Sequence, residues 1–343
     1  MIANKKKYAL LLLLVFILFA GCQKKEVLPV SEELPGPGIE TAAAGKISVC
    51  TFNIMWLGHY TKKDDAALAA LLSRFDLAII QEMTAPPIDG IYPDGAAYQA
   101  DPQAAAFYNA MISKGFSAIL SPEDTGPKDE IHNAGSGTEW FIAFYKSETL
   151  APATDLPQGF LDEDRSNHPV YQRVPYAFAF RTKSGNDFVV ISVHLVPGDK
   201  DDDEIRRQKE LNSIFGWIED NNDAEKDFII LGDMNIYNEE ELNSNLPEGW
   251  LSLNDECRTT TTSLDSDGNG KPYDQIIFNL ENSGNDIDEN FDCSPIDLIK
   301  SMRPFWTGPG LYPGDPYEHN LFKQYYSDHL PLEFKIKAVA DDD

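Results

Sequence analysis

Apolar and polar positions along the chain form two kinds of pattern, one typical of strands and one typical of helices. Short, nearly continuous apolar runs of the kind buried inside β-sheet proteins recur from residue 47 to residue 336. Some of these runs are separated by segments with apolar residues three and four apart, as on one face of a helix. The predicted strands are 47–52, 76–80, 140–145, 176–181, 187–194, 227–231, 275–278 and 332–336. The predicted helices are 64–75, 104–112 and 205–218.

Strands interleaved with a few helices, without regular alternation, predict a layered α+β domain with mixed sheets. The chain has 343 residues, which is long enough for such a domain with a large core. No internal repeat and no second domain boundary is visible in the sequence. The segments 148–170 and 281–325 are therefore interpreted as insertions on one core.

The N-terminus has the pattern of an export signal. Lys5, Lys6 and Lys7 precede an apolar run over residues 8–20, which suits a signal peptide and is too short to span a bilayer. Small residues directly before Cys22 resemble the bacterial lipoprotein cleavage signal, in which the cysteine is acylated. An ordinary secretory peptide with an incidental cysteine is the alternative. The predicted parts are a lipoprotein signal peptide (1–21), a lipid-anchored linker (22–45), the folded domain (46–337) and an acidic tail (338–343).

We therefore expect an exported monomer that lipidated Cys22 holds at a bacterial membrane, at the outer membrane or cell surface in a Gram-negative cell. The formal net charge is −28. Proteins that bind nucleic acid tightly normally carry a basic patch that displaces counterions. The charge therefore counts against tight, non-specific binding of polyanions, although weak binding through a local patch assisted by metal ions stays open.

Three further cysteines remain to be placed. Cys50 lies within an apolar strand and is predicted to be a small buried residue. Cys257 and Cys293 either form a disulfide in an oxidising compartment or stay unpaired, and the sequence leaves both alternatives open.

Polar residues suited to acid–base or metal chemistry stand repeatedly where a predicted strand begins or ends. One such residue is usually a turn or a cap, whereas several at one rim of a sheet are typical of a catalytic site. Asp233 and Asn235 are two apart, so in extended backbone both project to one side. Oxygen ligands such as Glu82, Asp233 and Asp328 suit Mg²⁺, Mn²⁺ or Ca²⁺ better than zinc. The strand-end residues are Asn53, Glu82, Glu139, His194, Asp233, Asn235, Asp274, Asp328 and His329.

Six of these segments resemble motifs of the DNase I-like endonuclease/exonuclease/phosphatase superfamily, in the same order and with similar spacing. The resemblance extends over about residues 46–337 and implies a four-layer sandwich, in which two packed mixed β-sheets are flanked by helices. The segments are 51–54 (Thr-Phe-Asn-Ile), 80–82 (Ile-Gln-Glu), 192–195 (Ser-Val-His-Leu), 232–235 (Gly-Asp-Met-Asn), 273–276 (Tyr-Asp-Gln-Ile) and 327–331 (Ser-Asp-His-Leu-Pro).

The resemblance implies a metal site and a phosphate site at matching positions. Glu82 resembles the principal ligand of Mg²⁺ or Mn²⁺, and Ca²⁺ stays open as a third metal. The further ligands implied are Asn53, Asp233 and Asp328. The residues implied to contact the substrate phosphate are Asn235 and Arg173.

The resemblance also implies two histidine–acid pairs, His329 with Asp274 and His194 with Glu139. Imidazole titrates near neutral pH, so it can take a proton from attacking water or give one to a leaving oxygen, while the carboxylate fixes the ring. We prefer His329 as the base and His194 as the acid. Asp233 completes the implied catalytic set.

Three functions stay open. The first is a phosphodiesterase or endonuclease of the DNase I type, although Met55, Thr84, Gly137 and Thr138 stand where such nucleases carry groove-reading arginine or tyrosine. The second is a phosphodiesterase or phosphatase acting on lipid headgroups or small phosphate esters. The third is a non-catalytic binding protein. Six aromatic residues either line the substrate site or belong to the core, namely Phe305, Trp306, Tyr312, Tyr317, Tyr325 and Tyr326.

Residues 265–270 (Asp-Ser-Asp-Gly-Asn-Gly) resemble the first half of a calcium-binding loop. The twelfth position of that loop is Ile276 rather than glutamate. A turn that leads into the strand at Asp274 explains the pattern as well and is preferred.

Overall fold

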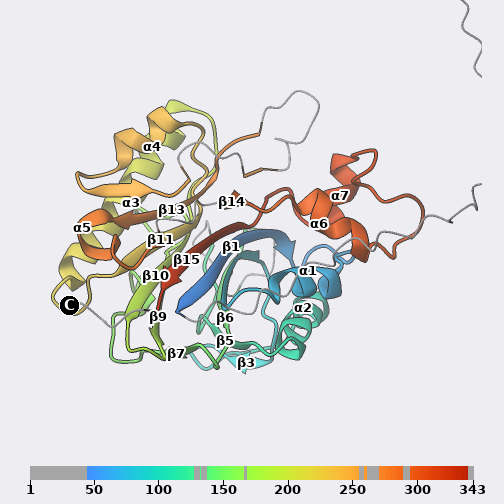
Figure 1. The fold of residues 1–343 in the computed structure, drawn as a ribbon, viewed down its shortest axis with the longest axis horizontal. Coiled ribbons are helices and arrows are strands. Elements are labelled where there is room, and N and C mark those ends of the chain that lie inside the picture. Colours follow the sequence, from blue (N-terminus) through green and yellow to red (C-terminus); the bar gives the residue numbers. More distant parts are fainter. Residues whose placement is uncertain are drawn as a thin grey trace, which may run out of the picture. The chain divides into compact units, whose positions relative to one another are not determined.

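The computed structural model describes residues 45–126, 132, 137–165, 168–254, 259–260, 270–288 and 294–338. In this part of the chain, two mixed β-sheets pack face to face and helices cover their outer faces (Figure 1). The predicted four-layer α+β architecture is therefore confirmed. The predicted signal peptide, the linker before Gly45, Cys22, Cys257, Cys293, residues 265–269 and the tail after Ala338 lie outside the described residues.

The first sheet consists of β1 (Lys46–Leu57), β2 (Leu77–Met83), β5 (Ser117–Leu120), β6 (Trp140–Tyr145), β14 (Ser294–Pro295) and β15 (Leu332–Lys337). Across the sheet these strands stand in the order β14-β15-β1-β2-β6-β5. Within this sheet β1 and β2 run parallel, and the other described pairings are antiparallel.

The second sheet consists of β7 (Leu150–Pro152), β8 (Gly159–Phe160), β9 (Tyr176–Thr182), β10 (Asp187–His194), β11 (Phe228–Asp233), β12 (Trp250–Ser252) and β13 (Asp274–Asn279). The order is β12-β13-β11-β10-β9-β7, and β8 also pairs with β9. Again two central strands, β10 and β11, run parallel while the other described pairings are antiparallel. A separate hairpin is formed by β3 (Gly90–Ile91) and β4 (Ala97–Tyr98).

Three apolar clusters separate the four layers. Alternate residues of a strand point to opposite faces, so Val49 of β1 packs between the sheets while Cys50 packs towards the helices. Val49 belongs to the same buried cluster as side chains of the second sheet such as Val190 and Ile229. Cys50 is fully buried, as predicted.

Helices cover both outer faces (Figure 1). Those on the first sheet are α1 (Asp65–Leu72), α2 (Pro102–Ser113), α6 (Leu298–Met302) and α7 (His319–Tyr325), with the short 3-10 helix η2 (Arg303–Phe305). Those on the second sheet are α3 (Asp201–Asn221) and α4 (Glu239–Asn245), and α5 (Leu280–Ser283) follows β13. The predicted helices correspond to α1, α2 and α3, whereas the shorter helices were not predicted.

The aromatic residues between 305 and 326 belong to the core. Tyr312, Phe322 and Tyr326 are buried in the cluster between the first sheet and its helices, and the other aromatic side chains of this segment pack against that cluster. Of the two alternatives for this insertion, the structure therefore favours packing over a substrate site.

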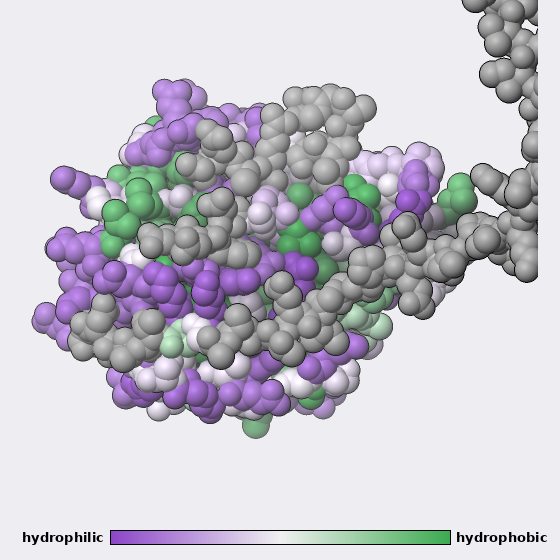
Figure 2. All heavy atoms as spheres, viewed as in Figure 1, coloured by the Kyte–Doolittle hydropathy of each residue, from purple (hydrophilic) through white to green (hydrophobic). Residues whose placement is uncertain are grey.

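Hydrophilic side chains cover much of the face shown in Figure 2, with apolar side chains interspersed. Among the helices that the structure describes, none has both the length and the apolar composition to cross a membrane.

Candidate active site

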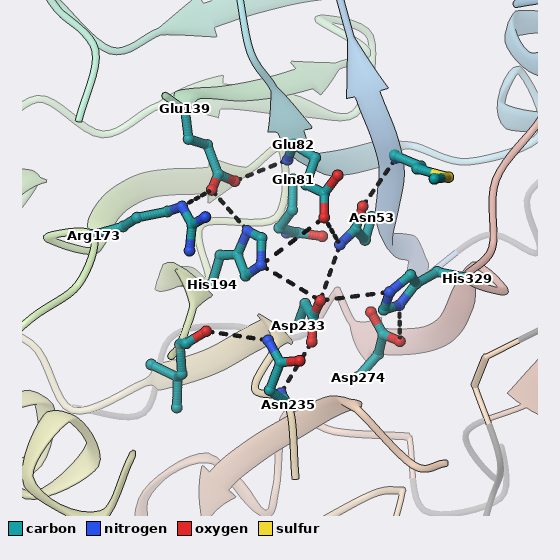
Figure 3. Close-up of polar contacts among 12 residues, drawn as sticks. Asn53, Gln81, Glu82, Glu139, Arg173, His194, Asp233, Asn235, Asp274 and His329 are labelled. Atoms are coloured by element: carbon teal, nitrogen blue, oxygen red, sulfur yellow. Dashed lines mark hydrogen bonds and ion pairs between the residues drawn. The ribbon is translucent and has the colours of Figure 1, made fainter. Parts of the chain in front are cut away.

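The site lies where the two parallel strand pairs end. Glu82 comes from the end of β2, His194 closes β10, and Asp233 closes β11. Asn53 lies in β1 beside Gln81 of β2. Ligand sites favour the carboxyl ends of parallel strands. Here the ends of two such pairs, one from each sheet, face one another (Figure 3).

Irregular backbone directs these side chains into the site. The register between β1 and β2 shifts after Asn53, and that between β2 and β6 shifts around Glu82. Glu82 has a φ of +61°, and Met55 and Trp56 of β1 also lie in the left-handed region, which costs free energy for residues other than glycine. At Gly232 the strands approach so closely that a Cβ would lie 2.2 Å from the carbonyl oxygen of Val193.

The first histidine–acid pair is His194 with Glu139. Nδ1 of His194 donates to Oε2 of Glu139 at 2.8 Å, and the main-chain N–H of Glu82 donates to Oε1 of Glu139 at 2.9 Å. Burial and the charge of Arg173 lower the pKa of His194, but Glu139 and Asp233 outweigh them, so that the pKa is raised. The pair joins the two sheets, because Glu139 precedes β6 and His194 belongs to β10.

The second pair, His329 with Asp274, also joins the two sheets. Nδ1 of His329 donates to Oδ2 of Asp274, the first residue of β13, at 2.7 Å. Burial opposes the charged imidazole, but Asp274, Asp233 and Asp328 raise the pKa of His329 well above its usual range. Both histidines are thereby fixed with Nδ1 on a carboxylate and Nε2 towards the centre of the site (Figure 3).

Asp233 is at that centre. Its Oδ2 lies 3.6 Å from Nε2 of His194 and 3.5 Å from Nε2 of His329. The Nδ2 of Asn53 donates to Oδ2 of Asp233 and to Oε1 of Glu82, both at 2.9 Å. Asn53 thus joins the two carboxylates through its amide nitrogen, while its Oδ1 accepts from the N–H of Met55 at 2.9 Å.

The donor set fits a divalent cation. Ligand atoms of Glu82, His194 and Asp233 lie within 4.8 Å of one another, and those of Asp233, Asp274 and His329 form a second such group. Burial raises the pKa of Glu82, with a smaller contribution from the charge of Asp328, so its carboxylate would gain from compensating positive charge. A bound cation would supply that compensation, and carboxylate oxygens suit Mg²⁺ or Mn²⁺.

The two residues implied for phosphate contacts lie on opposite sides of His194 (Figure 3). Nε of Arg173 lies 3.3 Å from Oε2 of Glu139, while Nη1 is buried and makes no hydrogen bond with the described residues. Asn235 has a φ of +51°, so the segment after β11 is not extended as predicted. Its N–H donates to Oδ1 of Asp233 at 2.9 Å, and its Nδ2 donates to the carbonyl of Leu195 at 3.1 Å.

Three residues that hold the site were not predicted as site residues. The main-chain N–H of Trp56 donates to Oε2 of Glu82 at 2.9 Å. Oγ of Ser327 donates to the carbonyl of Asn53 at 2.7 Å and accepts from the N–H of His329 at 3.0 Å. Lys63 is buried and donates to the carbonyls of Ile54, at 2.5 Å, and Tyr326. Ser327 lay within a recognised motif, but Lys63, among charged neighbours, had no such signal.

Solved structures with the same fold come from several bacteria. A functionally unknown conserved protein from Enterococcus faecalis V583 is 16% identical, with a TM-score of 0.53, and the match covers 84% of this chain and 99% of that one. The mannosyl-6-phosphatase from Bacteroides thetaiotaomicron VPI-5482 is 13% identical, with a TM-score of 0.53 and coverages of 84% and 99%. An endonuclease/exonuclease/phosphatase family protein from Bacteroides thetaiotaomicron is 13% identical, with a TM-score of 0.52 and coverages of 85% and 97%.

These identities show a shared fold alone. No curated protein sequence is a significant match to the chain. The sequence profile of the Endonuclease/Exonuclease/phosphatase family, however, matches residues 50–329, a span that contains every predicted metal, catalytic and phosphate-binding residue. On this match, the chain belongs to the Endonuclease/Exonuclease/phosphatase family.

Proposed function

We propose that this protein is a divalent-metal-dependent hydrolase of phosphate esters. One observation supports the proposal above the others: two histidines, each oriented by its own carboxylate, direct Nε2 towards the same oxygen of Asp233. This arrangement provides one proton-transferring group for attacking water and another for a leaving oxygen. Glu82, Asp233 and Asp328 would hold the metal ion.

Each residue then has a distinct task. When bound, the cation stabilises negative charge that develops on the phosphate oxygens. Arg173 binds the phosphate through its unpaired Nη1, and Asn235 through its amide group. His329 accepts the proton of the attacking water at Nε2, and His194 donates a proton from Nε2 to the leaving oxygen.

The raised pKa of His329 by itself favours the protonated imidazole, which cannot act as a base. Asp233 and Asp328 are two of the three carboxylates that raise it, and both are proposed metal ligands. A divalent cation bound to these carboxylates would therefore lower the pKa of His329 towards the range in which imidazole acts as a base.

A phosphodiester is the substrate we favour, on the resemblance to enzymes of the DNase I type, and the second histidine would protonate its leaving alkoxide. The net charge of −28 disfavours tight binding of duplex DNA. A small or lipid-headgroup phosphate ester is the second candidate. In its favour, the rings of Trp56 and Tyr60 stack at 5.5 Å, and the N–H of Trp56 binds Glu82, so an aromatic surface lies beside the metal site.

The test is hydrolysis by residues 22–343, with Mg²⁺, Mn²⁺ or Ca²⁺, of plasmid DNA, RNA, a bis-aryl phosphodiester, a phosphomonoester and choline phospholipids. We expect EDTA to abolish turnover and His329→Ala to lower kcat by at least about a hundredfold. Turnover that persists in EDTA, or an unchanged kcat in His329→Ala, would refute the mechanism. Inactivity on every substrate would favour a binding protein, and the substrate preference separates the two candidates.

We also propose that acylated Cys22 anchors the protein to a membrane, on the sequence pattern alone. In a bacterial host, the full chain should label with a radioactive fatty acid and sediment with membranes. Cys22→Ala should do neither, whereas Cys50→Ala, which changes a buried thiol, should do both. Equal labelling of the wild type and Cys22→Ala would exclude this anchor.

A further inference from the structure

We propose that Glu210 is a positioning residue that holds two loops of the site in place: the loop that carries Arg173 and the loop that follows His194. The inference rests on the proposed function, because both loops then present groups that act on a phosphate ester. Glu210 lies on α3, and its hydrogen bonds go to main-chain amides rather than to the proposed metal ligands.

The two oxygens of Glu210 bind two different loops. Oε1 accepts from the N–H of Gln172 at 2.6 Å, and Oε2 accepts from the N–H of Val196 at 2.9 Å. Gln172 directly precedes Arg173, and Val196 follows His194 by two residues. One rigid carboxylate on a helix therefore sets the separation of the loops.

Burying a carboxylate at this position costs desolvation free energy. Glu210 is fully buried, and burial raises its pKa, although the two amides and the charges of Arg206 and Arg173 act in the opposite direction. An apolar residue would fill the same space on the core face of α3 without that desolvation cost. The gain from glutamate is directional, because the carboxylate fixes two main-chain amides that an apolar side chain would leave free.

The loops meet again at the site. Arg173 and His194 both contact Oε2 of Glu139, at 3.3 Å and 2.8 Å (Figure 3). Glu210 thus anchors the backbone behind two side chains that share one carboxylate. If either loop shifts, the unpaired Nη1 of Arg173 moves relative to Nε2 of His194.

A second side chain of α3 holds the same loop. Arg207, one turn before Glu210, donates from Nη1 to the carbonyls of Val196 at 3.2 Å and Gly198 at 2.8 Å. Val196 is therefore held through its N–H by Glu210 and through its carbonyl by Arg207. The carbonyl of Leu195, between Val196 and His194, accepts from Asn235.

The first experiment compares Glu210→Gln with the wild type in kcat and KM. The amide group of glutamine turns a donor towards one of the two N–H groups, so one loop is released without a large change of volume. We expect kcat to fall by about tenfold to a hundredfold. Glu204→Gln, on an exposed position of the same helix, is the matched control and should leave both constants unchanged.

The second experiment measures inorganic phosphate binding by calorimetry at a fixed Mg²⁺ concentration. We expect Arg173→Gln to weaken phosphate by about tenfold. Glu210→Gln should weaken it less, and the double variant should lose less than the sum of the two single effects, because Glu210 acts in part through Arg173. The affinity for Mg²⁺ should be unchanged in Glu210→Gln.

A purely structural role would give other results. Ile218→Ala loosens the C-terminal end of α3, and if it lowers kcat as much as Glu210→Gln at equal loss of Tm, the inference is wrong. Additive effects of Glu210→Gln and Arg173→Gln on phosphate binding would also overturn it. Should Glu210→Gln not fold, Glu210→Asp keeps the buried charge, shortens its reach and should show the same loss.

Failure of the proposed function is distinguishable from failure of this inference. If the wild type hydrolyses no phosphate ester, the proposed function fails, and the phosphate titration still decides whether Glu210 positions Arg173. If the wild type is active and Glu210→Gln matches Glu204→Gln in both assays, only the positioning role is refuted.

Discussion

The helices on the two outer faces hold one site in different ways. On the first sheet, the buried residues of α1 are all apolar, namely Ala67, Leu68, Ala69, Leu71 and Leu72. On the second sheet, α3 buries Arg207 and Glu210 together with Leu211, Ile214 and Ile218. Apolar packing is not directional, whereas hydrogen bonds fix particular atoms. The α1 face therefore stabilises the sheet, while the α3 face also determines where the site loops lie.

The first sheet obtains its directional contacts from a loop instead. Lys63, just before α1, joins the carbonyl of Ile54 in β1 to that of Tyr326, which precedes the segment with Asp328 and His329. On each face, then, a buried ionisable side chain ties main-chain groups next to the site. The difference is that α3 carries its charges on a long helix, while Lys63 belongs to a connection.

The largest effect is expected for Arg207→Met. Nε of Arg207 donates to Oε1 of Glu241 at 2.6 Å inside the protein, and removing one partner leaves a buried charge uncompensated. Unfolding free energy should fall by about 3–5 kcal/mol, as measured by urea denaturation. Arg206→Met, on the exposed side of the same helix, should change it by less than about 0.5 kcal/mol. Equal losses in both variants would contradict the contrast between the faces.

Shortening a buried apolar side chain of α1, on the first sheet, should lower the stability of the protein without lowering its activity. Leu68 is fully buried in α1, and Leu68→Ala should lower the unfolding free energy by about 2–4 kcal/mol through lost burial and a cavity. Activity per folded molecule should stay within about twofold of the wild type, because α1 bonds no site loop through these side chains. Ile112→Ala, on a more exposed position of α2, is the control for stability. A fall in kcat of the folded Leu68→Ala protein would show that the apolar face also positions the site.

The same contrast explains what could be predicted from the sequence. The strand at 140–145 and the strand at 187–194 were predicted with the bounds that the structure has, because buried strands are short continuous apolar runs. Helix α3 was predicted from its apolar spacing, since Leu211, Ile214 and Ile218 all face the core. The short helices α4, α6 and α7 depend on tertiary contacts and have too few turns for a periodic pattern.

The site residues were predictable where a residue type suited to acid–base or metal chemistry ends a strand, as at His194 and Asp233. The residues behind it were not predictable, because nothing in the sequence distinguishes Glu210 from the exposed Glu204 on the same helix, or buried Lys63 from exposed Lys62. Which of two like charges is buried depends on the loops that pack over it, and these come from distant parts of the chain.

The smallest expected effect is the contribution of Lys63 to the pH dependence of the unfolding free energy. It tests the directional contacts on the first sheet. Burial lowers the pKa of Lys63 to about 7, although Asp328, Glu82 and Asp65 act against this. In the unfolded chain a lysine titrates near about 10.4. Between these values the unfolded chain binds a proton that the folded protein does not, so this group makes the folded state more stable as pH rises.

Lys63→Met removes this linkage. The difference in unfolding free energy, wild type minus Lys63→Met, should therefore rise between pH 7 and pH 9 by up to about 1.4 kcal/mol per pH unit. Urea denaturation is carried out in EDTA, so that no metal ion screens the charges of Asp328 and Glu82. Burial raises the pKa of Asp65 to about 6, so measurements above pH 7 avoid the titration of that carboxyl. The exposed Lys62→Met should show no such rise relative to the wild type. Parallel curves for the wild type and Lys63→Met would mean that Lys63 keeps its proton, and hence that a charged lysine binds the carbonyls of Ile54 and Tyr326 throughout this range.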